Sequence, residues 1–411
     1  MPNLKKHAQL ALLYFIIAAL LGCVLRFFRV FNIPITYKYI VHAHSHIALL
    51  GWVYLALTTL LYKLYLSKAE IGQNYKRIFW FTQFTLVGML LTFPFQGYAL
   101  FSIIFSTLFL FASYWFSWFF YKNLPSKFKS TASAKCAKAA LFYLLISSIG
   151  PWTLGGIMNT LGAESVWYRI AIYFYLHFLY NGWMIMTLVA VYLFILEEHR
   201  IAITSKAFKK FYQMLNLGIG LSFFLSTLFA KPSIFLYILG GLGAAFQLCA
   251  FYILLKASGS KSVMIAPLFS KFQNKTIQLT VVLLGIKMVM QFLSAIPYFA
   301  QLAVTYLDMT IGYLHLTFLG VVTLCLFVFL DFFELLRIKK SFFHLYLVGF
   351  ALTEILIFYK GITAWAATTL FSAYYPSLAV TSLLILMALI GLLTVNYFRV
   401  SLSSKKKLSK N

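Results

Sequence analysis

The 411-residue chain is too apolar for a soluble protein: hydrophobic residues make up 62% of it, charged residues 10%, and the mean hydropathy is +0.88. Soluble domains contain about 45–50% apolar and about 25% charged residues, which excludes a soluble enzyme, a disordered chain and a coiled coil. A net charge of +26 would indicate nucleic acid on a soluble chain, but basic residues also gather in cytoplasmic loops of membrane proteins. We therefore expect an all-α, polytopic membrane protein whose partner is the lipid bilayer and not nucleic acid.

A membrane-spanning helix needs about 20 mostly apolar residues. Twelve such runs are expected at 8–30, 39–64, 77–96, 98–121, 138–160, 167–196, 211–229, 232–256, 276–297, 308–333, 342–371 and 376–399. The connections at Gln96-Gly97 and Lys231-Pro232 are very short and predict antiparallel hairpins. We find no sequence repeat, and we expect one integral-membrane domain over 1–411 that ends in a basic cytoplasmic tail at 400–411.

Positive charge alternates along the chain. Most of the 34 Lys and Arg residues lie at the chain ends and in every second connection between the spans. The other connections hold Arg26, Arg29, Lys38, Arg169 and Lys231. Under the positive-inside rule, this alternation predicts that both termini are cytoplasmic, as in a multi-pass protein of a bacterial inner membrane.

Five of the eight histidines fall inside expected spans: His42, His44 and His46 in 39–64, His177 in 167–196 and His315 in 308–333. Ionisable residues at membrane depth are costly and are functional candidates by default. At about 1.5 Å per residue, the depths of the five agree within roughly 10 Å. We interpret them as one layer of metal ligands in the outer half of the membrane, because purely structural histidines have no reason to share a depth.

The types of residue in this layer limit which metals it could bind. No cysteine lies in this layer, and an all-imidazole set suits heme iron, copper or zinc. His42 and His46 share a helix face, whereas His44 points about 200° away, so the stretch can serve two sites, and geometry alone leaves open which histidine serves which. Heme propionates would also need cationic partners. The cations just above the layer are Arg26, Arg29, Lys38 and Arg169. For each of them, a place at a helix end in the membrane interface is an equally good explanation.

Other polar residues also lie inside the expected spans. Lys287, Gln291 and Ser294 follow an i, i+4, i+7 spacing and share one face of 276–297. Lys287 and Glu354 are expected to form a buried pair that fixes packing, or a proton or ion relay that includes Gln291. Gln247 is expected to hydrogen-bond between helices.

Three local motifs resemble the catalytic subunits of the heme-copper oxidase superfamily, and within it the NnrS-type membrane proteins linked to nitric oxide stress. HSHIALLGW, from His44, is similar to the NnrS-type pattern HxHxxxxG followed by an aromatic residue. GYLHLTFLG, which contains His315, resembles that family's HxxxxG segment. HFLYNGW, from His177, falls where the superfamily places a copper-ligating histidine. The resemblance implies a b-type heme between His315 and one of the histidines of 39–64, with copper as a further candidate metal.

The chain departs from the oxidase pattern at three places. Tyr313 stands where oxidases carry the proximal histidine of a second heme, 211–229 lacks their histidine pair, and Asn181 replaces their tyrosine. We therefore expect an incomplete binuclear centre in a heme protein that handles nitric oxide or oxygen, or that passes electrons to a redox partner. An oxidoreductase activity stays open. The alternative is a transporter for a metal ion or a proton-coupled solute that uses the buried histidines with Lys287 and Glu354.

Overall fold

A computed structural model describes residues 2–68 and 70–408, with side chains described as far as Tyr397. Within these residues every regular element is helical, and twelve helices are long and apolar enough to cross a membrane. They are Leu4–Phe27, Tyr37–Leu66, Gly72–Gln96, Leu100–Asn123, Ala132–Thr160, Val166–Glu198, Ser205–Ala230, Ile234–Gly259, Lys271–Leu293, Leu307–Phe332, Lys340–Trp365 and Tyr374–Tyr397, here called spans 1 to 12. The predicted all-α fold with twelve spans is confirmed.

Seven spans are single α-helices, because their sequences are apolar throughout and carry few helix breakers. They are α1 (Leu4–Phe27), α4 (Gly72–Gln96), α5 (Leu100–Asn123), α11 (Ile234–Gly259), α13 (Lys271–Leu293), α17 (Lys340–Trp365) and α18 (Tyr374–Leu408). Short helices in the connections are η3 (Ser126–Phe128), α12 (Ser262–Ile265), η6 (Ala266–Leu268) and α14 (Pro297–Thr305). The predicted basic tail at 400–411 lies outside the residues whose side chains are described.

The other five spans change helix type or break along their length. Span 2 consists of α2 (Tyr37–His46), η1 (Ile47–Tyr54), α3 (Leu55–Leu61) and η2 (Tyr62–Leu66). Span 5 consists of α6 (Ala132–Ser147) and α7 (Ile149–Thr160), and span 7 of α10 (Ser205–Ser222) and η5 (Phe223–Ala230). Span 6 consists of α8 (Val166–His177), η4 (Phe178–Met184) and α9 (Ile185–Glu198), and span 10 of α15 (Leu307–His315), η7 (Leu316–Val322) and α16 (Thr323–Phe332).

The chain divides into two compact units. Unit 1 comprises Met1–Phe119 and Leu326–Asn411, and unit 2 comprises Phe120–Cys325. Spans 4 and 10 pass from one unit into the other. The expectation of a single domain stays a prediction, and each unit is described by itself below.

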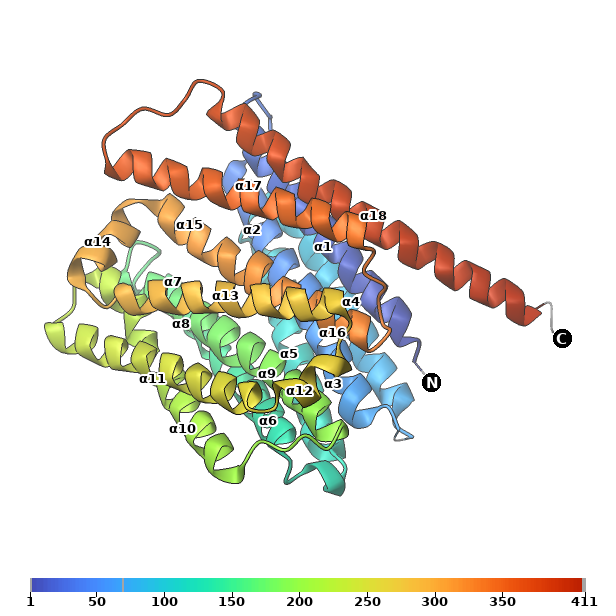
Figure 1. The fold of residues 1–411 in the computed structure, drawn as a ribbon. Coiled ribbons are helices and arrows are strands. Elements are labelled where there is room, and N and C mark those ends of the chain that lie inside the picture. The colour runs from blue at the N-terminus through green and yellow to red at the C-terminus, as the bar shows by residue number, and fades with distance from the viewer. Residues whose placement is uncertain (1, 69, 409–411) are drawn as a thin grey trace. The chain divides into compact units, whose positions relative to one another are not determined.

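Aromatic side chains fill the core of unit 1. The ring of Phe15 stacks on that of Trp52 at 4.9 Å, and Phe327 lies 5.8 Å from Trp52 and 5.3 Å from Tyr346. These contacts join spans 1, 2, 10 and 11, and α18 packs along both α1 and α17 (Figure 1). Aromatic side chains bury large apolar areas, so this cluster fixes how α1 and the second span meet.

In unit 2, α10 packs along α11, and α6 along α9. The side-chain amide of Gln247 on α11 donates to the carbonyl of Gly218 at 3.1 Å and to the hydroxyl of Ser222 at 2.6 Å, both on α10. The predicted interhelical hydrogen bond of Gln247 is therefore confirmed. Glu197, at the end of α9, accepts from the backbone N–H and the hydroxyl of Ser133 on α6.

Backbone conformation explains the two shortest hairpins. Gly97 follows α4 with φ +60°, and a Cβ atom there would lie 2.4 Å from the ring of Tyr39. Glycine alone adopts this conformation without strain and leaves room for the ring. Lys231 ends η5 in the left-handed conformation, and Pro232 follows it.

Candidate functional site

The three spans that carry the intramembrane histidines share one local design. In each of them the helix changes from α to π immediately after a histidine, where α2, α8 and α15 end. These α-segments are 10, 12 and 9 residues long, so each histidine lies at a similar distance from the start of its own span. π-helical turns are rare and frequently mark functional sites. The histidine–glycine pairs, each with five residues from one to the other, are His46 and Gly51, His177 and Gly182, and His315 and Gly320.

Histidine, four residues and glycine thus form a short repeat in these three spans. It was not predicted from the sequence, although the pattern can be found there. Two of the glycines permit close helix packing. A Cβ atom at Gly51 would lie 2.8 Å from the Cβ of Tyr14 in span 1, and one at Gly182 would lie 2.5 Å from the Cβ of Tyr143 in span 5. Real Cβ atoms do not approach this closely, so the glycines let the preceding span lie against the π segment.

The same three spans are the most buried of the twelve. In the most apolar stretch of each, 89% of the residues of span 2, 94% of span 6 and 67% of span 10 are buried, against at most 50% in any other span. Helices that are apolar on all sides belong in the interior of a bundle. Of the histidines on these spans, His177 is buried, and His42, His44, His46 and His315 are half-buried.

The imidazole of His44 faces span 1. Its Nδ1 lies 2.8 Å from the carbonyl oxygen of Ala18, and a Cβ atom at Gly22 would lie 3.0 Å from its Cε1. The carbonyl is an acceptor only, so Nδ1 carries the proton and Nε2 keeps its lone pair. Within the described chain, Nε2 of His44 makes no hydrogen bond. Metal-ligating histidines are commonly anchored in this way.

His42 and His46 lie on the opposite face of α2, as the helical spacing predicts. Both rings contact Tyr98, with centroids at 4.5 and 5.8 Å, and His46 also packs on Phe93 at 4.4 Å. Nδ1 of His46 is anchored on the carbonyl of His42 at 2.8 Å, and its Nε2 lies 3.2 Å from the hydroxyl of Tyr98. The structure therefore separates His44 from the other two by environment.

The predicted partners of heme propionates are dispersed. Arg26 closes α1 and is near enough to His44 to interact with it electrostatically, and it interacts in the same way with Glu354 of α17. Arg29 and Lys38 are exposed. The carboxylate of Glu354 is 7% exposed, and neither of its oxygens has a hydrogen-bond partner among the described residues.

In unit 2, both ring nitrogens of His177 are engaged. Nε2 donates to the carbonyl of Ile219 at 2.8 Å, and Nδ1 accepts from the side-chain amide of Asn181 at 3.3 Å. Coordination of copper by His177 stays a prediction, and it would require one of these two bonds to be replaced.

Asn181 leads from His177 to a buried amine. The amine of Lys287 on α13 donates to Oδ1 of Asn181 and to Oε1 of Gln291, each at 2.5 Å. It also lies 5.6 Å from the ring centre of Tyr180 and 5.8 Å from that of Tyr313. The bond to Gln291 confirms that these two residues share a helix face. We call His177, Asn181, Lys287, Gln291 and Tyr313 the Lys287 network.

The Lys287 network includes two of the three departures from the oxidase pattern. The hydroxyl of Tyr313 donates to Oε1 of Gln291 at 3.3 Å, and Asn181 accepts from Lys287. Asn181 thus bonds directly to Lys287, and Tyr313 bonds to the same Gln291 oxygen that accepts from Lys287. The expected pairing of Lys287 with Glu354 stays a prediction, because the two belong to different units.

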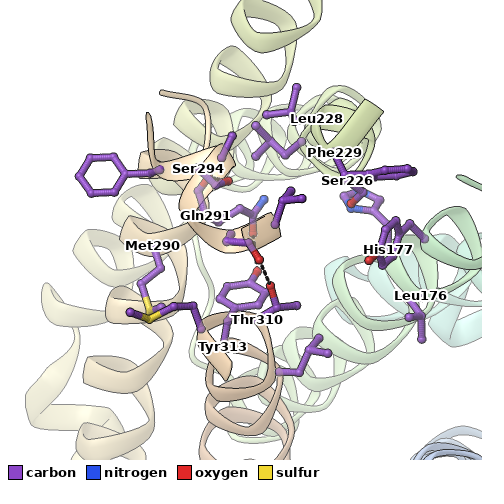
Figure 2. Close-up of a pocket in the computed structure, with 18 of the residues that line it drawn as sticks. Leu176, His177, Ser226, Leu228, Phe229, Met290, Gln291, Ser294, Thr310 and Tyr313 are labelled. Carbon is purple, nitrogen blue, oxygen red and sulfur yellow. Dashed lines mark hydrogen bonds between the residues drawn. The ribbon is translucent and has the colours of Figure 1, made fainter. Parts of the chain in front are cut away.

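A cavity of about 360 Å³ lies beside the Lys287 network, within unit 2. His177, Gln291 and Tyr313 face it from α8, α13 and α15, and Phe229 of η5 closes another side (Figure 2). Arg169 lines its rim, with the guanidinium 4.4 Å from the ring centre of Phe229. Several of these residues were predicted from the sequence as site residues, whereas the cavity was not predicted.

Among the described residues, no three His, Cys, Asp or Glu side chains gather closely enough to hold a metal ion. His315 ends α15 and is half-buried, and its place in the resemblance stays a prediction. No protein-family model matches this chain, and no curated protein sequence matches it.

Proposed function

We propose that this chain is a multi-pass protein of a bacterial inner membrane, with both termini cytoplasmic, that binds a b-type heme through histidines inside its spans. It would handle nitric oxide or oxygen, or transfer electrons to a redox partner. The observation that carries the proposal is the anchored imidazole of His44, whose Nδ1 is held by the Ala18 carbonyl while Nε2 stays available.

The donor chemistry of span 2 fits a heme better than a bare ion. Porphyrin supplies the equatorial nitrogens, so the protein has to provide only axial side chains, whereas a bare copper or zinc ion takes most of its ligands from the protein. The imidazole of His44 offers one oriented nitrogen, Nε2, as such a ligand. His46 is the second choice, because its Nε2 is already near Tyr98. By resemblance, His315 would be a further ligand of the heme.

A bound heme would supply reversible electron transfer, or an iron to which a diatomic ligand binds. The residues of this chain would hold and orient it. The Ala18 carbonyl fixes the ring of His44, and Arg26 is the cation best placed in unit 1 to pair with a propionate. The apolar surroundings of span 2 would exclude water and tune the reduction potential.

The test is a pyridine-hemochrome and metal analysis of full-length protein purified in detergent. We expect a Soret band and stoichiometric heme b, which substitution His315→Ala removes. The control is His199→Ala, which removes a histidine just beyond the end of span 6 whose Nδ1 is held by the carbonyl of Ile195. A colourless protein, or heme retained in His315→Ala, would contradict the proposal.

A second function, transport of a metal ion or a proton-coupled solute, is favoured by the Lys287 network and its cavity. Among the described residues of unit 2, the buried amine of Lys287 hydrogen-bonds to two amide oxygens, and buried ionisable groups at membrane depth commonly mark the path of an ion or proton. The heme-free outcome above, together with uptake of radioactive zinc into proteoliposomes that is lost in Lys287→Met, would support this alternative.

A further inference from the structure

We propose that the cavity of unit 2 binds the carboxylate head and adjoining methylenes of a single-chain amphiphile, of which a long-chain fatty acid is the simplest example. The proposal goes beyond heme binding and does not depend on it. It rests on the charges around the cavity, on one unused hydrogen-bond donor and on the apolar remainder of its walls.

Two cationic side chains lie at or near the cavity, and no acidic side chain lines it. Arg169 is the only charged side chain that lines it, and the amine of Lys287 lies directly behind two lining residues, Asn181 and Gln291. No Asp or Glu lines the cavity, and among the described residues of unit 2 Lys287 contacts no carboxylate. A buried amine in these surroundings carries a desolvation cost that a bound anion would offset.

Gln291 provides the donor. Its Oε1 accepts from both Lys287 and Tyr313, which fixes the orientation of the amide. Its Nε2 is then directed away from these partners and makes no hydrogen bond within the described residues. Figure 2 shows the Gln291 side chain reaching into the cavity. An amide N–H₂ group held in place beside a cation is suited to bind a carboxylate oxygen.

The other walls are mostly apolar, although the hydroxyl-bearing residues Ser222, Ser226 and Thr310 also line them. Leu176, Phe229, Met290 and Leu314 line them, and the surface at the rim is also apolar, with Val304 41% and Leu307 65% exposed. Ligand pockets in proteins range over about 300–1,000 Å³, so this cavity has room for a small ligand or part of one chain. An amphiphile that enters from the bilayer would place its head at Gln291 and its chain toward the exposed apolar rim.

The charges distinguish this ligand from other lipophiles. A neutral quinone would accept hydrogen bonds but would leave the field of Lys287 and Arg169 uncompensated, and a cationic amphiphile would be repelled by it. A small inorganic anion would leave the apolar walls unused. A carboxylate with an alkyl chain satisfies both parts of the cavity.

The experiment uses full-length protein in phosphatidylcholine nanodiscs and a palmitic acid that carries a photoreactive diazirine. We expect labelling on the peptides that contain Met290 or Leu314, lowered at least tenfold by excess palmitate but not by hexadecanol. The substitution Gln291→Glu puts an acid next to Lys287 and against the ligand head, and should lower labelling at least tenfold. Gln273→Glu, the same change in the first turn of α13, should leave labelling within twofold.

Three results would overturn the proposal: competition by hexadecanol or a short-chain quinone equal to that of palmitate, labelling confined to other peptides, or unchanged labelling in Gln291→Glu. If Gln291→Glu fails to fold, Ser226→Phe fills the cavity from η5 and carries the same expectation. Labelling of His44→Ala should match the unsubstituted protein, so failure of heme binding and failure of this proposal are separable.

Discussion

Spans 2 and 6 both carry histidines near their turns from α to π, yet the ring nitrogens of His44 and His177 are used differently. In span 2, a backbone carbonyl of span 1 holds Nδ1 of His44, and Nε2 has no hydrogen-bond partner in the described chain. In span 6, the carbonyl of Ile219 and the amide of Asn181 take both nitrogens of His177. The turn from α to π directly follows His46 and His177, whereas His44 lies two residues before it and faces span 1, and these different neighbours decide which ring nitrogens are already bonded.

Removing each imidazole in turn gives the strongest test of whether His44 and His177 have different roles. We expect His44→Leu to lose nearly all bound heme, because the ligand with an available Nε2 is gone. His177→Gln should retain heme within twofold, since His177 serves hydrogen bonding in this comparison. The measurement is heme per protein by pyridine hemochrome, and equal losses in the two variants would show that His177 also ligates.

A double-mutant cycle tests the unit 2 side. Asn181→Leu removes one of the two amide acceptors of Lys287 and leaves a buried amine poorly partnered, which should cost about 3 kcal/mol of stability. Adding Lys287→Met should recover most of this loss, because the uncompensated polar group is then absent. Thermal unfolding in detergent measures both. Additive losses would mean that the two side chains act independently.

Much of the fold follows from the sequence alone, because a helix that spans a lipid bilayer needs a long apolar run, and each span is such a run. The opposite facing of His44 and His46, and the bond from Lys287 to Gln291, follow from helical periodicity within one element. The bond from Lys287 to Asn181 joins residues 106 positions apart, and no local pattern predicts such a pairing. The π turns likewise depend on how adjacent spans pack.

The glycines of the repeat give a smaller test. Gly182→Ala and Gly51→Ala would each force a methyl group against a tyrosine of the preceding span, at a cost of about 1–3 kcal/mol. Gly285→Ala on α13 has no atom within 4 Å of the added Cβ and should be neutral, or stabilising by up to about 1 kcal/mol. Melting temperatures would rank the three, and a neutral Gly182→Ala would refute the close packing.

The smallest effect concerns which imidazole of span 2 is used. Tyr98→Phe removes the hydroxyl beside Nε2 of His46 and should cost about 1 kcal/mol. Because we assign the heme to His44, its optical spectrum should not change. A shifted Soret band in this variant would instead assign the ligand to His46.

The π segments also bear on how these spans respond to a change in length. A π turn holds one residue more than an α turn between its hydrogen-bonded partners, so deleting one residue from Ile47–Tyr54 lets the backbone return to an uninterrupted α-helix. The same deletion in α11 would rotate everything beyond it by about 100°. The histidine-bearing spans can thus lose one residue from a π segment and stay helical. The deletion would remove the wider backbone turn that lies next to the imidazole.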